Sequence, residues 1–434
     1  MNPIEIIQGR AFISNRIMDV TIHVKDGIIS KIEYGSISKF GNKVLKLPLN
    51  YLILPGIIDI HTHFRDWELS YKETLSSGTA AAAYGGVVLA IDMPNTKPPL
   101  NNLVAIKRRF HEAMSSVYTD YWVYSGIPNN IKELEKIIKY GYVAGFKIYP
   151  EDLSSKVLKK ALKLITAHKM LIILHSETYM STEKCLFFDL GSRYVCRSLA
   201  SMIESTEYIS SLIRDEEMNR KNLHITHIPY YDLAVKARVI GATCDTCLHY
   251  ILLDSDDEAC SCRYKINPPL TPYIERLKLL KALIDGSIDA ITTDHAPHTL
   301  GDKSLPPTLC PSGIASIEYA FKLLFTYVVR NIMSLSKYVK LVSENPARIL
   351  RLEHYLGSID EGKLASFTIV DVKGHGRVDG PKYSKACCVG FEGYSYEGEF
   401  AMTIVRGCIA HEIGVGVHRC GSIIPLIIEP KLFT

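Results

Sequence analysis

The feature that most constrains the fold is a series of short apolar runs between about residues 54 and 298, separated by longer segments with helical spacing. The eight runs are 56–61, 86–93, 121–126, 143–149, 170–175, 223–227, 242–246 and 288–293. The clearest helical segments between them are 130–139, 154–168, 198–214 and 274–285. Continuous apolar runs are typical of strands covered on both faces, and helical connections indicate a parallel sheet. Eight such units predict an α/β fold, a closed (β/α)₈ TIM-like barrel.

The two ends of the chain have a different pattern. Residues 21–24 form a short β-type segment before a turn at 25–27, and segments 367–370 and 402–405 in the tail are similar, with glycines nearby. We therefore expect both termini to build one small β-sandwich domain beside the barrel. The predicted boundaries are 1–53 and 346–434 for the two parts of the small domain and 54–345 for the barrel.

Charge and hydropathy exclude several classes of protein. The chain of 434 residues has 50 Lys and Arg against 46 Asp and Glu, a formal net charge of +4, and no basic block that would favour nucleic acid. No apolar run approaches the roughly 20 residues that span a bilayer, and the N-terminus lacks the pattern of a secretion signal. We expect a soluble, cytoplasmic protein without a nucleic-acid or membrane partner.

Four of the eleven cysteines form a cluster, Cys244-x-x-Cys247 followed by Cys260-x-Cys262. Four thiolates can close a tetrahedron around a structural zinc ion. The alternative is a set of buried or loosely exposed thiols with an occasional disulfide. CxC is a poorer chelating spacing than CxxC, so the second interpretation is favoured.

Ligand-capable side chains stand at the C-terminal ends of five predicted strands. They are His61, His63, Lys147, His175, His227 and Asp294. A lone strand-end histidine is usually structural, and a lone lysine usually keeps its head in solvent. Their joint occurrence is decisive, because these strand ends converge on the barrel face where active sites lie. Imidazole and carboxylate ligands predict a metal site of the kind that zinc occupies.

Lys147 differs from the others because an ammonium group cannot bind a cation. Burial or nearby positive charge can lower the pKa of a lysine. A neutral amine can take up carbon dioxide and become a carbamate, a bidentate anion able to bridge two metals. We therefore hypothesise from the sequence that Lys147 is carbamylated.

A set of motifs in a fixed order resembles a known family. The motifs are His61-Thr62-His63-Phe64-Arg65-Asp66, Tyr71-Lys72-Glu73-Thr74, Met93-Pro94-Asn95-Thr96 with Pro98, Gly145-Phe146-Lys147-Ile148-Tyr149, His175-Ser176-Glu177, Asn267-Pro268-Pro269-Leu270, Thr293-Asp294-His295-Ala296-Pro297-His298, and a tail from Gly357-Ser358-Ile359 to Asp371. Together they resemble the amidohydrolase superfamily and, within it, the class I dihydroorotases. The similarity covers nearly the whole chain.

The resemblance implies a centre of two Zn²⁺ ions. One ion would be held by His61, His63 and Asp294 and the other by His175 and His227, with carbamylated Lys147 and a hydroxide as bridges. It also implies substrate-binding roles for a second set of residues, namely Arg65, Asn95, Asn267, His298 and, with a less defined role, His249. The chemistry agrees, since the planar fork of Arg65 suits a carboxylate and Asn95 can both donate and accept hydrogen bonds.

The activity implied by the resemblance is the reversible cyclisation of N-carbamoyl-L-aspartate to L-dihydroorotate in pyrimidine biosynthesis. The bridging hydroxide would be the nucleophile and Asp294 the general acid and base. Allantoinase and dihydropyrimidinase are alternatives because they share the metal frame, although Arg65 favours a substrate with a carboxylate. An inactive scaffold homologue, for example one bound to aspartate transcarbamoylase, is a third alternative. A homodimer is the assembly that the family implies.

The sequence departs from the family pattern at several places. Trp67 stands where a proline is common, Thr271 where an arginine is frequent, and Leu248-His249-Tyr250 where the family has a Pro-His-His run. Residues 183–196 also differ from the usual loop. No metal-ligand position is lost, so these differences bear on carboxylate binding and loop closure. Residues 267–273 and 300–312 are the predicted loops over the substrate.

Overall fold

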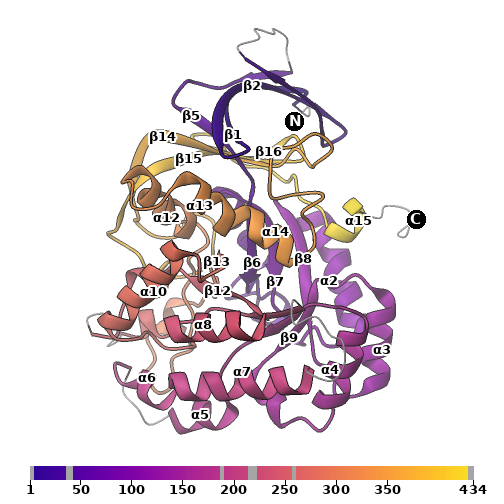
Figure 1. Cartoon of the computed structure of the whole chain (residues 1–434), viewed down its shortest axis with the longest axis vertical. Coiled ribbons are helices and arrows are strands. Elements are labelled where there is room, and N and C mark those ends of the chain that lie inside the picture. Colours follow the sequence, from indigo (N-terminus) through magenta and orange to yellow (C-terminus); the bar gives the residue numbers. More distant parts are fainter. Residues whose placement is uncertain (1–3, 36–42, 186–189, 214–221, 257–260, 429–434) are drawn as a thin grey trace.

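Eight parallel strands in chain order form the central barrel of the protein (Figure 1). The computed structural model describes residues 4–35, 43–185, 190–213, 222–256 and 261–428. The barrel strands are β6 (Ile57–Thr62), β7 (Val87–Asp92), β8 (Asp120–Gly126), β9 (Gly145–Ile148), β10 (Ile172–Leu174), β11 (Leu223–Ile225), β12 (Thr243–Cys247) and β13 (Ala290–Thr292). Each lies in or overlaps one of the eight predicted apolar runs, so the predicted barrel is confirmed.

Burial explains why these strands have apolar runs without alternation. Every residue of the eight strands is buried except Thr243 at the start of β12. Side chains on one face fill the barrel and those on the other contact the surrounding helices, so neither face selects for polar residues.

The first and last strands complete a nearly closed barrel. Thr62 pairs with His295 in an isolated parallel bridge, and the His63 backbone N–H donates to the carbonyl of His295 over 2.9 Å. Beneath this contact, Thr293 donates its hydroxyl to Asp59 Oδ2 over 2.5 Å. The closure brings the ends of β6 and β13, which are far apart in sequence, to one place on the rim.

Helices cover the outside of the barrel. They are α1 (Leu75–Tyr84), α2 (Leu103–Ser116), α3 (Ile131–Tyr140), α4 (Leu158–Ala167), α5 (Tyr179–Lys184), α6 (Arg193–Cys196), α7 (Leu199–Ile213), α8 (Tyr231–Ile240), α9 (His249–Leu252), α10 (Tyr273–Asp285), α11 (Leu300–Lys303), α12 (Ala320–Val329), α13 (Leu335–Val339) and α14 (Asn345–Ile349). Side chains of Asn102 and Asn130 cap α2 and α3 by accepting from backbone N–H groups in the first turn. The predicted helix over 154–168 begins only at Leu158, because residues Pro150–Ser154 form the separate 3₁₀ turn η2.

Both ends of the chain build a separate sheet, which confirms that part of the prediction. It comprises β1 (Ile6–Ile13), β2 (Arg16–Lys25), β3 (Ile28–Tyr34), β4 (Val44–Lys46), β5 (Tyr51–Pro55), β14 (Phe367–Arg377), β15 (Ser395–Val405), β16 (Cys408–Glu412) and β17 (Gly416–Val417). The N- and C-terminal parts join where β5 pairs with β14. In Figure 1 this sheet curls above the barrel, while α15 (Ile424–Ile428) returns beside β8. The domain boundaries 1–53, 54–345 and 346–434 stay predictions.

The cysteines do not gather as the zinc alternative requires. Cys262 forms a disulfide with Cys310, so its sulfur is not available as a ligand. Cys244 and Cys247 are buried free thiols, and burial raises the pKa of both thiols well above the ordinary value. Cys260 lies outside the described residues. Two further disulfides join Cys185 to Cys196 and Cys408 to Cys420.

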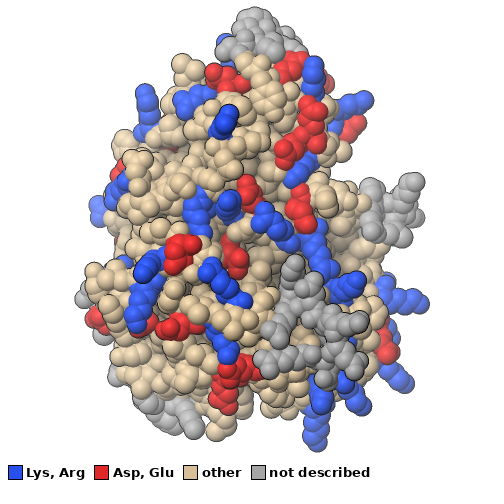
Figure 2. All heavy atoms as spheres, in the orientation of Figure 1, with Lys and Arg blue, Asp and Glu red and all other residues tan. Residues whose placement is uncertain are grey.

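The surface in Figure 2 has basic and acidic side chains interspersed, as the near-balance of charges predicts. In the described part of the chain, no helix combines the length and apolar character needed to cross a membrane.

Candidate active site

A cavity of about 280 Å³ lies at the C-terminal ends of the barrel strands. Ten of the eleven residues predicted for the site line it, and they are His61, His63, Arg65, Asn95, Lys147, His175, His227, Asn267, Asp294 and His298. The remaining wall is formed by Tyr149, Pro150, Glu151, Arg197, Ala296, Ser312 and Gly313. The tertiary structure thus brings together side chains from β6, β7, β9, β10, β11 and β13 or the segments that follow them, and Asn267 from the segment after β12.

His249 is the predicted residue that does not line the cavity. It is the first residue of α9, its ring lies 4.4 Å from that of Tyr250, and it is buried. Burial lowers the pKa of His249 to about 4. A contact between His249 and substrate stays a prediction without support from this geometry.

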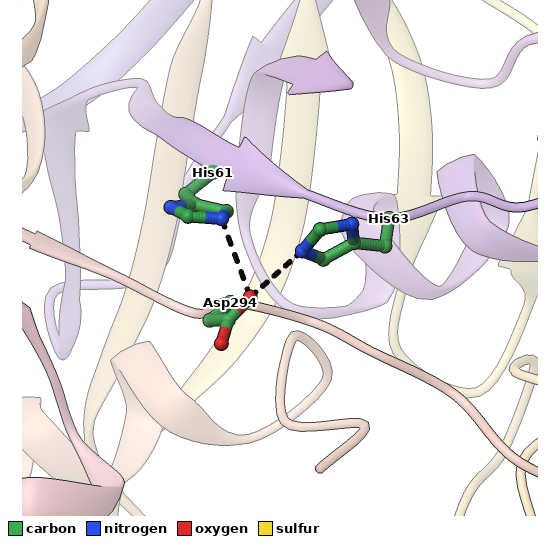
Figure 3. A group of neighbouring side chains, drawn as sticks. All are labelled: His61, His63 and Asp294. Carbon is green, nitrogen blue, oxygen red and sulfur yellow. Dashed lines mark hydrogen bonds and ion pairs between the residues drawn. The ribbon is translucent and has the colours of Figure 1, made fainter. Parts of the chain in front are cut away.

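His61, His63 and Asp294 form a compact group at the junction of β6 and β13 (Figure 3). Their nearest ligand atoms lie within 4.8 Å of one another. Asp294 Oδ1 is 3.3 Å from His61 Nε2 and 2.9 Å from His63 Nε2. All three residues are buried.

The hydrogen bonds of the two Nδ1 atoms determine the tautomers of His61 and His63. His61 Nδ1 lies 2.5 Å from Thr226 Oγ1, whose own proton is donated to Asp245 Oδ2. His61 Nδ1 must therefore carry the proton. His63 Nδ1 lies 2.7 Å from Asn95 Oδ1, an amide oxygen that can only accept. His61, whose pKa burial holds well below normal, therefore directs its Nε2 lone pair toward Asp294, and His63 Nε2 lies within hydrogen-bond distance of the same carboxylate oxygen.

His175 and His227 lie on the other side of His61. The ring of His227 is 5.0 Å from that of His61 and 4.5 Å from that of His175. His175 Nε2 lies 2.5 Å from Glu177 Oε2, which leaves Nδ1 as its free ligand atom. His227 Nδ1 is buried without a hydrogen-bond partner in the described structure. Burial, and after it the positive charge of Lys147 and neighbouring histidines, keeps the pKa values of His61 and His227 well below normal.

Lys147 is fully buried in the floor of the cavity. Its Nζ atom has no hydrogen-bond partner among the described residues and lies 5.4 Å from the centre of the Tyr149 ring. Burial lowers the pKa of Lys147 to about 7. A large fraction of this amine is therefore neutral near neutral pH.

Asp294 remains a carboxylate in spite of its burial. Burial alone would raise its pKa, but the hydrogen bond and charge of His63 hold it below the ordinary value. Its backbone has a φ of 45°, in the left-handed region that few residues other than glycine adopt. His227 and Arg65 share this conformation with φ of 44° and 52°. Such backbone strain gathers at functional sites, where the surrounding structure holds it in place.

Arg65 supplies a positive charge to the cavity wall. It is 8% exposed, and it forms no ion pair within the described part of the protein. Its Nε atom is buried without a partner. A guanidinium in this state has donors available for an anion in the cavity.

His298 uses both ring nitrogens within the protein. Nε2 donates to the Ser312 carbonyl over 2.9 Å, and Nδ1 lies 3.2 Å from Lys72 Nζ, a donor.

Gly313, the residue after Ser312, has a φ of 145°, and a Cβ there would lie 2.5 Å from the Ala296 carbonyl oxygen. Only glycine allows the backbone to approach so closely at this wall.

Sequence reasoning did not identify Arg197 or the role of Glu177. Arg197 donates to both carboxylate oxygens of Glu177, with a 2.6 Å bond from Nε, and to Asn267 Oδ1 over 2.7 Å. Glu177 lies in the motif His175-Ser176-Glu177, but no spacing in the sequence indicates a role for Arg197. It follows a loop that departs from the family pattern.

Comparison with known proteins agrees with this arrangement. A model described as the amidohydrolase family matches residues 52–409. The dihydroorotase of Saccharolobus solfataricus is 35% identical over 401 residues, which are 92% of this chain and 93% of the relative. That of Sulfurisphaera tokodaii is 34% identical over 406 residues, 94% of each. The L-hydantoinase (dihydropyrimidinase) structure from Arthrobacter aurescens covers 97% of this chain and 99% of its own with a TM-score of 0.86 at 22% identity, which shows a shared fold. The chain belongs to the amidohydrolase family.

Proposed function

We propose that the protein is a zinc-dependent dihydroorotase, an enzyme that interconverts N-carbamoyl-L-aspartate and L-dihydroorotate. It is a cyclic amide hydrolase acting on a small molecule, as its family membership and relatives support. The observation that carries the choice of substrate is the unpaired Arg65 guanidinium beside the histidine cluster. A buried cation of this kind favours a ligand with a carboxylate. Dihydroorotate has one, whereas allantoin and dihydrouracil have none.

The arrangement of acceptor atoms fits a metal centre. His61 Nε2, His63 Nε2 and the Asp294 carboxylate converge, and a cation between them would be bound by all three once the two rings carry their protons on Nδ1. His61 resists protonation because it is buried. A metal ion would be such a cation, with nitrogen and oxygen ligands that suit zinc.

The second set of ligands also fits. His175 Nδ1 and the orphaned polar atoms of His227 and Lys147 would hold a second ion, with Lys147 as a carbamate between the two. The fully buried Lys147 amine supports this chemistry, because it has no partner and its pKa falls to about 7. Glu177 and Thr226 fix the rings of His175 and His61 from behind, as the hydrogen-bond partners of metal ligands commonly do.

The residues of the cavity have separate roles in the proposed reaction. The two zinc ions, when bound, supply Lewis-acid polarisation of the ring carbonyl and a water of lowered pKa. Asp294 accepts the proton of the attacking water on its carboxylate and gives it to the departing ring nitrogen. Arg65 binds the substrate carboxylate. Asn95 has its oxygen occupied by His63, so its amide N–H groups are available to the ring. Cyclisation follows the same steps in reverse.

The alternatives are distinguished by the substrate and the ligand set. The hydantoinase structures share only the fold at this level of identity. An inactive scaffold would be expected to lack ligands, and here each predicted position holds a ligand-capable residue that lines the cavity. A homodimer, an association with aspartate transcarbamoylase and a cytoplasmic location stay predictions.

A substrate panel combined with chelation tests the function. We expect zinc-loaded protein to hydrolyse L-dihydroorotate, followed by ultraviolet absorbance, and to act at least about 100-fold more slowly on allantoin and dihydrouracil. Removal of metal should abolish turnover, and Zn²⁺ should restore it. Preference for either substrate without a carboxylate contradicts the dihydroorotase assignment. Full activity after exhaustive chelation contradicts the metal centre.

Substitution of Arg65 tests carboxylate recognition. Arg65→Met should lower kcat/KM for dihydroorotate by about 100- to 1,000-fold, because a buried charge pair to the substrate is lost. Slow turnover of dihydrouracil should change little. Arg65→Lys keeps the charge without the planar fork and should lie between the two. An equal loss for both substrates in Arg65→Met would show that Arg65 does not recognise the carboxylate.

A further inference from the structure

Three donors converge on the side-chain oxygen of Asn267. Arg193 Nη2 lies 2.6 Å, Arg197 Nη1 2.7 Å and Ser312 Oγ 3.1 Å from Asn267 Oδ1. A guanidinium can donate but never accept, so the atom that both arginines contact must be the amide oxygen. The Nδ2 group is then what Asn267 can offer to a molecule in the cavity.

Arg197 connects this amide to the histidine cluster. On its other side it forms a bidentate ion pair with Glu177, which in turn contacts His175 Nε2. Glu177 is fully buried, and both of its carboxylate oxygens accept from Arg197. The contacts His175–Glu177–Arg197–Asn267 therefore form a continuous chain of side chains.

Arg193 holds Asn267 from the neighbouring position. Its Nη1 donates to the Ile266 carbonyl over 3.0 Å, so one guanidinium spans the backbone of residue 266 and the side chain of residue 267. Arg193 begins α6 and Arg197 directly follows it, so both arginines come from one short segment. They are 6% and 5% exposed. A lysine has one ammonium nitrogen and cannot make this pattern of contacts.

We propose that Arg193 and Arg197 are positioning residues that orient the Asn267 amide, so that the substrate meets N–H donors there. The substrate group opposite Asn267 is then a hydrogen-bond acceptor, a carbonyl or carboxylate oxygen. This inference rests on the proposed function, since it deepens the account of how the ring substrate is recognised. Arg197 has a second role, because it also holds the partner of His175.

A double-mutant cycle between Arg193 and Asn267 tests the proposal. Arg193→Met should raise KM for dihydroorotate by about 10- to 100-fold with kcat within about twofold, and Arg193→Lys should recover part of the loss. In an Asn267→Ala background, which itself raises KM, Arg193→Met should have no further effect. Arg197→Met should also raise KM and, through His175, lower metal content. Arg263→Met is the matched control, because Arg263 is exposed, pairs with Glu392 and does not line the cavity.

The outcomes separate this proposal from the proposed function. An unchanged KM in a folded Arg193→Met protein, or the same KM increase with and without the Asn267 side chain, overturns the positioning role. Wild-type protein that fails to turn over dihydroorotate overturns the function instead. If Arg193→Met does not fold, as judged by thermal melting, Arg193→Lys in both backgrounds gives the same comparison, and additive KM effects there overturn the proposal.

Discussion

Asp294→Asn is expected to retain the fold and lose turnover by about 100- to 10,000-fold, the range that general acid–base catalysis contributes. The asparagine has the same shape and still offers one oxygen to His61 and His63, which lie 3.3 and 2.9 Å from the carboxylate. It cannot accept a proton from water or return one to the ring nitrogen. Steady-state turnover and metal content measured on the same preparation check the prediction.

The control is Asp232→Asn, an exposed aspartate in the first turn of α8, which should leave turnover unchanged. Near-wild-type turnover of the Asp294→Asn protein would reject the assignment of Asp294 as general acid and base. A protein that loses both its metal and its turnover would instead indicate that Asp294 acts mainly as a ligand.

Lys147→Ala should lose both metal and activity. The Lys147 amine is fully buried and has no partner in the described structure, which supports the proposed carbamate bridge. Alanine would remove that proposed bridge and leave a space at the floor of the cavity. Short carboxylic acids such as acetate should enter that space, supply two oxygens and restore part of the metal content and turnover. Metal analysis and activity with increasing acetate measure the effect.

Lys147→Met provides the matched control because its side chain fills the space that alanine leaves. It should lose metal to the same extent, and acetate should restore neither metal nor turnover. Full metal content and normal turnover of Lys147→Ala without added acid would exclude the carbamate bridge.

The sequence predicted the barrel because each strand is buried on both faces. This burial favours apolar residues at every position of the strand and produces a continuous apolar run. β9 (Gly145–Ile148) lies inside the predicted run 143–149 for this reason. The gathering of the ligand-capable residues followed from the same topology. Residues at the ends of parallel barrel strands must meet at one face, wherever they stand in the chain. His61 and His63 share a direction because alternate residues of an extended segment do.

The contacts between loop residues could not be predicted from any pattern in the sequence. Arg193 and Arg197 reach Asn267 through a segment whose path depends on packing, and nothing in their spacing indicates that partner. The disulfide between Cys262 and Cys310 spans 48 residues and was not predicted from the Cys-x-Cys spacing. His249 shows how the local path of a loop affects the position of a predicted residue. It follows β12 by two residues, but the turn into α9 places its ring beside Tyr250 and outside the cavity wall.

The amino-acid sequence by itself determined the barrel, the sheet built from both chain ends and the set of ligand-capable residues at the strand ends. These depend on local patterns of burial and on the fixed geometry of parallel strands. Only the tertiary structure decided the tautomers of His61 and His63, the isolation of the Lys147 amine and the orientation of the Asn267 amide. Each of these depends on which polar atoms from distant segments meet in a buried space, where an unpaired donor or acceptor has no water to satisfy it.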